Sequence, residues 1–234
     1  MNMRIIMLVL LVVAGLPPSA KAQALADSGD SSGAVAISIP AHPDLTYTRP
    51  TTTIKFHSYL FDAFGPYPIA GAAFAAGISQ AYNTPPEWKQ GAQGYSKRFG
   101  SDFGIAAIST TTRYGLAQAF QEDTLYYRCE CKGMLPRLRH AVISTLTARR
   151  GDDGHRVFSV SALIAPYAGS MTAVYAWYPG RYNGKDGFRM GNYTMLGYAG
   201  GNIALEFFYS GPHSLLHRMH LNNGHGAPDP SPNP

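Results

Sequence analysis

The sequence predicts a mainly α fold, a single-domain bundle of four to six helices packed through small residues. Alanine dominates the long apolar stretches and β-branched residues are few in them, a composition that favours helix. Apolar residues also recur at intervals of three and four, the spacing of one helix face. The segments 157–163 and 172–178 are rich in serine, threonine and tyrosine, so a mixed α+β fold stays open as the alternative.

The first 22 residues have the features of a cleavable secretory signal peptide. Arg4 supplies a positive start, residues 5–16 are an unbroken apolar run, and an Ala-x-Ala cleavage site follows. The mature protein is therefore expected to begin at Gln23. We expect it to be exported, to the periplasm or envelope of a bacterium or out of the cell.

The segments at both ends of the mature chain lack a periodic apolar face. Residues 23–50 are rich in Ser, Gly, Asp and Pro, as is the tail 222–234. Such composition predicts a flexible lead-in and a disordered tail. The helical domain is then expected over 51–221, which suffices for one core.

Helical spacing marks several segments of this domain in order. The first covers Ile69–Tyr82, and the second is expected from the capping box Thr84–Glu87 as far as Phe120, because the box would satisfy the first backbone N–H groups. The remaining helices are expected over 135–150, 157–178 and 193–209, with a kink at Pro166.

Small residues four apart predict close helix contacts, with Gly100, Gly197 and Gly201 at the closest approaches. The pairs are Gly71/Ala75, Ala73/Gly77, Gly100/Gly104 and Gly197/Gly201. The charge-free segments 66–83 and 157–178 are long enough to raise the question of membrane spans. Their prolines and polar residues weaken insertion, so core helices are the favoured interpretation.

Charge argues against a nucleic-acid partner. Without Arg4 and Lys21, the 19 basic residues fall to 17 against 14 acidic ones, a net charge of +3. No run of five like charges occurs, and the densest basic residues, Arg137, Arg149 and Arg150, are expected on a solvated helix face.

Glu206 is the strongest candidate for a buried ionisable group, because Ala, Leu and two Phe residues flank it. A buried carboxylate is costly unless it is paired, so we expect a cation beside it. Such a pair can handle protons or can fix helix register, and the structural role is favoured. Its candidate partners lie in apolar helical contexts and are Arg98, Arg113, Arg128 and His140.

Two further patterns concern a possible metal site and a possible disulfide. His213, His217 and His220 share one face if their segment is helical, which suits zinc, copper or nickel, but no acidic residue lies between them. A surface polar face is the favoured interpretation, and no cofactor is expected. Cys129 and Cys131 form a C-x-C pair that can close a small disulfide ring in an oxidising compartment.

The segment PPEWKQGAQGYSKRFGS, within a stretch of about 60–210, resembles a group of exported bacterial proteins with no assigned activity. The resemblance implies a bacterial, envelope-directed protein. No nucleophile elbow, Walker loop or dinucleotide fingerprint occurs. We therefore expect a non-enzymatic envelope protein that binds membrane, lipid or another envelope component. The alternatives are a periplasmic enzyme centred on Glu206, His140 and an arginine, and a metal-binding module of the three histidines.

Overall fold

The computed structural model describes residues 47–208 and 224–230, which are mainly helical, as the sequence predicts. The predicted signal peptide and His213, His217 and His220 lie outside the described residues. The helices are α2 Thr52–Phe64, α3 Pro66–Ala81, α4 Gly91–Ala119, α5 Met134–Ile143, α6 Val160–Ala176 and α7 Gly184–Phe208. The short elements are the 3-10 turn η1 Pro86–Trp88 and the strands β1 Glu122–Asp123, β2 Tyr127–Arg128, β3 Thr147–Arg150, β4 His155–Phe158 and β5 Ala227–Pro228.

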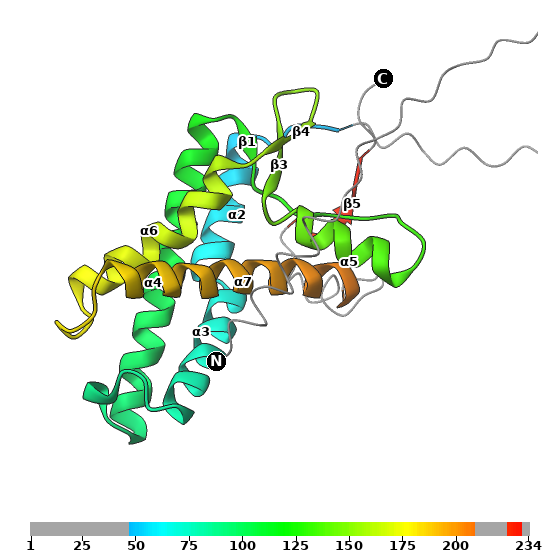
Figure 1. Ribbon diagram of the computed structural model, residues 1–234. Coiled ribbons are helices and arrows are strands. Elements are labelled where there is room, and N and C mark those ends of the chain that lie inside the picture. Colours follow the sequence, from blue (N-terminus) through cyan, green and yellow to red (C-terminus); the bar gives the residue numbers. More distant parts are fainter. Residues whose placement is uncertain (1–46, 209–223, 231–234) are drawn as a thin grey trace, which may run out of the picture. The chain divides into compact units, whose positions relative to one another are not determined.

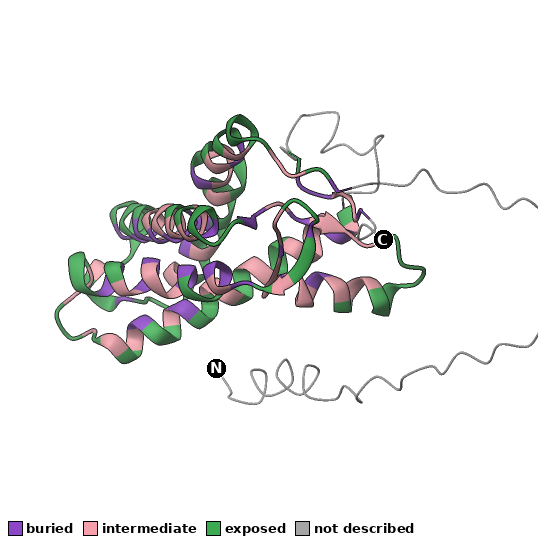
Figure 2. Cartoon of the chain, turned by 90° about the horizontal axis from the view of Figure 1, so that it is seen from above, coloured by how far each residue is buried: buried purple, intermediate pink, exposed green. Residues whose placement is uncertain are grey.

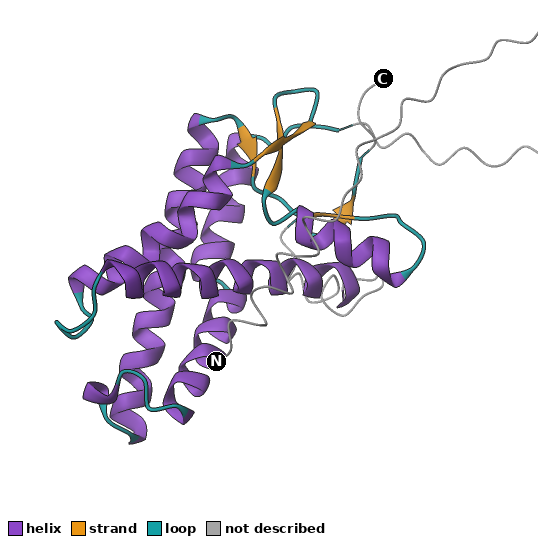
Figure 3. Cartoon of the chain, in the orientation of Figure 1, coloured by secondary structure: helices purple, strands orange, loops and turns teal. Residues whose placement is uncertain are grey.

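Helix α4 is the element around which the other helices pack (Figure 1). It contacts α2, α3 and α6, while α7 packs on α6 and α5 packs on α7. The strands are confined to short segments between helices and near the end of the chain, as Figure 3 shows. They form an antiparallel sheet in the order β1-β3-β4 and a parallel pair of β2 with β5.

The predicted helix over 135–150 is wrong at its end, because α5 stops at Ile143 and residues 147–150 are strand β3. Gly151 and Gly154 take positive φ values of 72° and 67°. That backbone conformation suits glycine and lets the chain reverse direction. The reversal pairs β3 with β4, with Thr147 opposite Phe158. Of the alternative strand segments, 157–158 is therefore correct, whereas 160–163 and 172–176 are helical.

The predicted helix start at the Thr84–Glu87 capping box is also wrong. The 3-10 turn η1 begins within this segment, at Pro86, and α4 begins only at Gly91. Lys89 and Gly91 have φ values of 59° and 84°, so the backbone leaves helical geometry between the two elements.

Two helix starts show capping that the spacing analysis did not use. Ser159 caps α6 by accepting a hydrogen bond from the backbone N–H of Ala162 at 3.0 Å. Ahead of α7, Asn183 N–H donates to Asp186 and the Asn183 side chain accepts from Lys185 N–H. This arrangement starts α7 at Gly184, nine residues before the predicted helix.

Figure 2 shows buried positions distributed along the helices. The buried apolar residues are mainly alanines, which agrees with packing through small residues. The prediction that Gly100, Gly197 and Gly201 lie at the closest helix contacts is nevertheless wrong. A Cβ added at Gly100, Gly197 or Gly201 would meet nothing within 4 Å. Close approach occurs instead at Gly169, where a Cβ would meet Ser109 Oγ and lie 2.5 Å from the carbonyl oxygen of Ile105.

This contrast gives a paired test of helix packing. Gly169→Ala is expected to lower the free energy of unfolding by about 1–3 kcal/mol, because α4 and α6 must separate to admit the methyl group. Gly100→Ala is expected to raise it by about 0.5–1 kcal/mol, because the open site gains helix propensity without a clash. Urea unfolding of both variants measures this, and equal effects would contradict the assigned α4–α6 contact.

Within the described residues, no helix has both the length and the apolar character needed to cross a membrane, and this includes α3 and α6.

Candidate functional site

Glu206, near the end of α7, lies at the centre of a buried polar cluster. Its side chain is 0% exposed, as predicted, and it is paired with a cation. Arg137 Nε donates to Oε1 at 2.9 Å, while Oε2 accepts from the Tyr126 hydroxyl at 2.6 Å and from Cys129 N–H at 3.0 Å. Arg137 also donates to the Glu206 carbonyl oxygen. Both carboxylate oxygens are therefore engaged, and Glu206 joins α7 to α5 and to the segment containing β2.

The cation beside Glu206 is Arg137, which we expected on a solvated helix face. Its side chain is only 28% exposed, and its guanidinium also lies 4.7 Å from the centre of the Phe207 ring. Arg137 and His140 are three residues apart, so they share a face of α5 that packs on α7. That shared spacing with the predicted partner His140 was the signal that could have identified Arg137.

His140 is a sequence-predicted partner that the structure brings to Glu206. Its Nδ1 is 3.8 Å from Glu206 Oε2 and 3.4 Å from the Tyr126 hydroxyl. Its Nε2 lies 2.6 Å from Arg156 Nη2 and 3.5 Å from Asp229 Oδ2, so the ring stands between the Glu206 cluster and Asp229. The Tyr126 hydroxyl donates to Glu206.

Residues 224–230 contradict the predicted disordered tail, because they pack against the helical domain. β5 pairs with β2, and Asp229 accepts from Arg149 and Arg156 at 2.5 and 2.8 Å. Burial alone would raise the pKa of Asp229, but hydrogen bonds from His140 and Arg149 lower it below its usual range. Arg149, which we expected on a solvated face, is therefore buried, and its contact with Asp229 holds this segment against the domain.

His225 from the same segment binds a carboxylate on α2. Tyr126 N–H donates to His225 Nδ1 at 3.1 Å, so the ring proton is on Nε2, which lies 3.0 Å from Asp62. The Tyr114 hydroxyl donates to the same carboxylate at 2.6 Å. Burial would raise the pKa of Asp62, yet contact with His225 and Tyr114 lowers it. Tyr47, which the sequence places in the lead-in, also contacts the domain, because its hydroxyl donates to Asp123. Residues beyond both predicted ends of the helical domain therefore pack against it.

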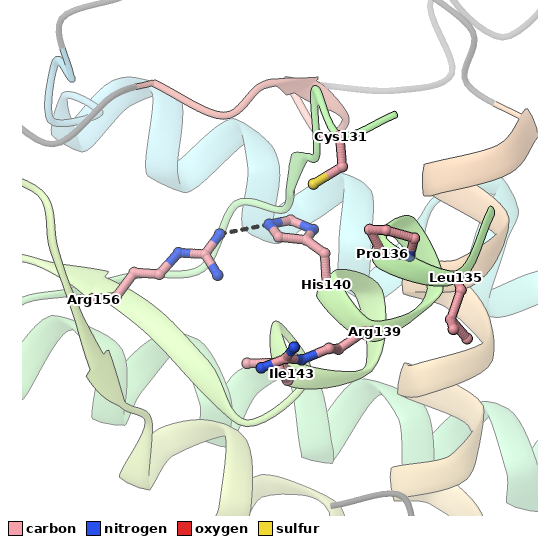
Figure 4. A pocket seen from close by; sticks show the side chains of 7 residues that line it. All are labelled: Cys131, Leu135, Pro136, Arg139, His140, Ile143 and Arg156. Atoms are coloured by element: carbon pink, nitrogen blue, oxygen red, sulfur yellow. Dashed lines mark hydrogen bonds between the residues drawn. The ribbon is translucent and has the colours of Figure 1, made fainter. Parts of the chain in front are cut away.

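A cavity of about 400 Å³ opens beside His140 (Figure 4). One face of α5, the end of the β2–α5 loop and a β4 side chain form its wall. The lining residues are Cys131, Leu135, Pro136, Arg139, His140, Ile143 and Arg156. None of these seven is acidic. The surface of the cavity is therefore mainly apolar, and the charged residues among its lining residues, Arg139 and Arg156, are basic.

Cys129 and Cys131 form a disulfide with each other. Cys131 is exposed and lines the cavity, whereas Cys129 is half-buried. The backbone N–H of Cys131 donates to Cys129 Sγ at 3.2 Å.

The other predicted cations lie elsewhere. Arg98 is buried, and its guanidinium is held by oxygens of the α3–α4 connection, a structural role. Its hydrogen-bond acceptors are Gln80 Oε1, Asn83 Oδ1 and the carbonyls of Thr84, Pro85 and Lys89. Arg113 lies 5.7 Å from the Tyr198 ring centre, and Arg128 pairs with Glu130 at 3.0 Å.

Asp102, one turn after Arg98, is a half-buried acid that the sequence did not point to, and its Oδ2 atom is buried. Its Oδ2 has no hydrogen-bond partner among the described residues. Burial raises the pKa of Asp102 to about 7, despite the opposing charge of Arg98. Arg98 cannot offset the burial fully because its donors are already engaged by the α3–α4 connection.

Comparison with known proteins adds no relative. The chain matches no protein-family model, no curated protein and no solved structure. Among the described residues, no group of three His, Cys, Asp or Glu side chains could hold a metal ion.

Helices α2 and α3 each expose several large apolar side chains. They follow one another along α4 (Figure 1). Phe56, Leu60 and Phe64 are exposed at four-residue intervals on α2, and α3 exposes Phe74 and Ile78 among others. We call these the α2–α3 apolar stripes; they comprise Ile54, Phe56, Leu60, Phe64, Tyr67, Ile69, Phe74, Ile78 and Tyr82, the last directly after α3. Helix α3 itself contains no Asp, Glu, Lys, Arg or His.

Proposed function

We propose that the chain is an exported envelope protein that associates with the surface of an anionic lipid bilayer through the α2–α3 apolar stripes. The observation that carries this proposal is the exposure of α3. Phe74 is 73% exposed on a helix with no charged residue over Pro66–Ala81. A helix that faced water would need polar side chains there, and apolar surface of this kind marks an interaction site.

Three features favour a bilayer over a protein partner. Tyr67 and Tyr82 lie at the two ends of α3, and tyrosine is favoured where apolar and aqueous layers meet. The acid of α2, Asp62, is held inside by Tyr114 and His225, whereas Lys55 and His57 are basic. The mature chain also has a net charge of +3. Anionic headgroups would complement these charges while the stripes enter the interface.

The acid–base alternative centred on Glu206 and His140 has less support. Glu206 is fully buried and both of its oxygens already accept hydrogen bonds, so it is poorly placed to receive a substrate proton. A role in fixing the contacts of α5 and α7 accounts for the same geometry.

The test is co-sedimentation of the mature chain with vesicles of phosphatidylglycerol and phosphatidylethanolamine. We expect binding, and we expect the double variant Phe74→Glu, Ile78→Glu to weaken it roughly a hundredfold, because each exposed side chain contributes about 1.5 kcal/mol of apolar burial in the interface. Both positions are exposed, so the fold should persist.

The matched control is Met134→Glu, Leu135→Glu, which places the same charges on residues of α5 that are 75% and 74% exposed. We expect this control to bind like the parent. Equal loss in both double variants, or a parent that forms dimers in light scattering and ignores vesicles, would contradict the proposal.

A further inference from the structure

The Cys129–Cys131 disulfide lies on the β2–α5 loop, on different elements from the stripes on α2 and α3. Cys131 is exposed and contributes to the wall of the cavity, and Figure 4 shows its sulfur beside the imidazole of His140. Exposed disulfides are the ones open to attack by an incoming thiolate. The position of Cys131 therefore directs such attack through the cavity to its Sγ.

The second sulfur has a feature suited to a leaving group. Attack on Cys131 would release Cys129 as a thiolate, and Cys129 Sγ already accepts the backbone N–H of Cys131 at 3.2 Å. A hydrogen bond to the charged sulfur favours the thiolate, and a more stable leaving thiolate leaves faster. The carboxylate of Glu206 is near Cys129, but its charge is balanced by Arg137.

The cavity also favours one charge type in the incoming molecule. Arg139, His140 and Arg156 line it together with Leu135, Pro136 and Ile143, and none of the lining residues is acidic. Arg156 is paired with Asp229, whereas Arg139 is exposed and makes no ion pair among the described residues. An anionic molecule with a short apolar body would complement this surface.

We propose that the Cys129–Cys131 disulfide is a thiol–disulfide exchange site for a small anionic thiol that Arg139 holds in the cavity. The thiolate sulfur bonds to Cys131 Sγ, the Cys129–Cys131 bond breaks, and Cys129 keeps the electron pair. A second thiolate then attacks the mixed disulfide and releases Cys131. Two thiols become one small disulfide, and the protein gains two thiols, so electrons balance without another oxidant.

The experiment compares ring opening of the oxidised mature chain by glutathione, 2-mercaptoethanol and cysteamine, which are anionic, neutral and cationic thiols. Rates are measured by alkylation and mass spectrometry at low ionic strength and are expressed per thiolate. We expect glutathione to react about tenfold faster than cysteamine, because the cavity concentrates anions. Arg139→Gln should bring the two rates close together, and Arg189→Gln, a change at an exposed arginine of α7, should leave the preference intact.

Single-cysteine variants locate the attacked sulfur. These variants are treated with glutathione disulfide, so that the remaining cysteine thiolate displaces one glutathione thiolate and keeps the other glutathione as a mixed disulfide. Cys129→Ser is expected to form this mixed disulfide on Cys131, and Cys131→Ser is expected to form much less on Cys129. The inference is overturned if cysteamine reacts as fast as glutathione, if Arg139→Gln keeps the full preference, or if Cys129 is the better trap. The vesicle-binding result is independent of each of these outcomes, because the α2–α3 apolar stripes contain none of the residues changed here.

Discussion

Glu206→Leu is expected to lower the free energy of unfolding by about 3–5 kcal/mol, because it leaves a buried cation without its partner. Arg137 Nε, the Tyr126 hydroxyl and Cys129 N–H would all lose their acceptor, and leucine offers none in return. Glu206→Gln keeps an acceptor oxygen, so its cost should be smaller, about 1–3 kcal/mol. Urea unfolding at pH 7 measures both changes.

Glu130→Leu is the matched control, since Glu130 pairs with Arg128 at the surface with 48% of its side chain exposed. An exposed pair contributes little, so we expect a cost below about 1 kcal/mol. If Glu206→Leu cost no more than this control, Glu206 would not be the anchor that joins α7 to α5.

Asp102→Asn is expected to stabilise the protein at pH 8 by up to about 4 kcal/mol, the free energy that corresponds to raising the carboxyl pKa from 3.8 to about 7 on folding. The folded state binds this proton more tightly than the unfolded state. Stability of the parent therefore falls as pH rises from about 4 to about 7, and the loss is complete above that range. At pH 4 the parent carboxyl is largely neutral in the fold, so the benefit of asparagine should vanish.

Asp62→Asn is a control for which the change in stability should have the opposite sign, because the pKa of Asp62 is lowered in the fold. Its carboxylate stabilises the fold above the unfolded pKa, and that contribution is lost as pH falls through the folded pKa. Asp62→Asn should therefore destabilise at neutral pH and have a decreasing effect in acid. Parallel pH profiles for the two variants in thermal melts would contradict the assigned environment of Asp102.

The sequence was sufficient for the fold class and for the burial of Glu206. Apolar spacing and alanine content identify α3, α4, α6 and α7 at least in part, and the apolar neighbours of Glu206 imply a paired carboxylate. The apolar spacing did not identify α2. It also assigned β3 to a helix, because a four-residue strand next to a helix has too few residues to show its own period.

Long-range partners were the part that spacing could not supply. Arg149 meets Asp229 across 80 positions of sequence, and His225 meets Asp62 across 163. The segment around Asp229 looks unstructured by composition, but the arginines Arg149 and Arg156, the β2–β5 pairing and the contact of His225 with Asp62 hold it against the helices. The glycine assignments failed for a related reason, since residues four apart at Gly197 and Gly201 look the same whether their helix face is covered or open.

Binding of bilayers through α3 is tested most directly by fluorescence quenching from lipids brominated along their acyl chains. Tryptophan is introduced at Phe74 on α3 in one variant and at exposed Ser96 on α4 in another, and the signal of the parent is subtracted. We expect the tryptophan at position 74 to be quenched and the one at position 96 to be unaffected. Equal quenching at both positions, or none at position 74 when vesicles are bound, would contradict the claim.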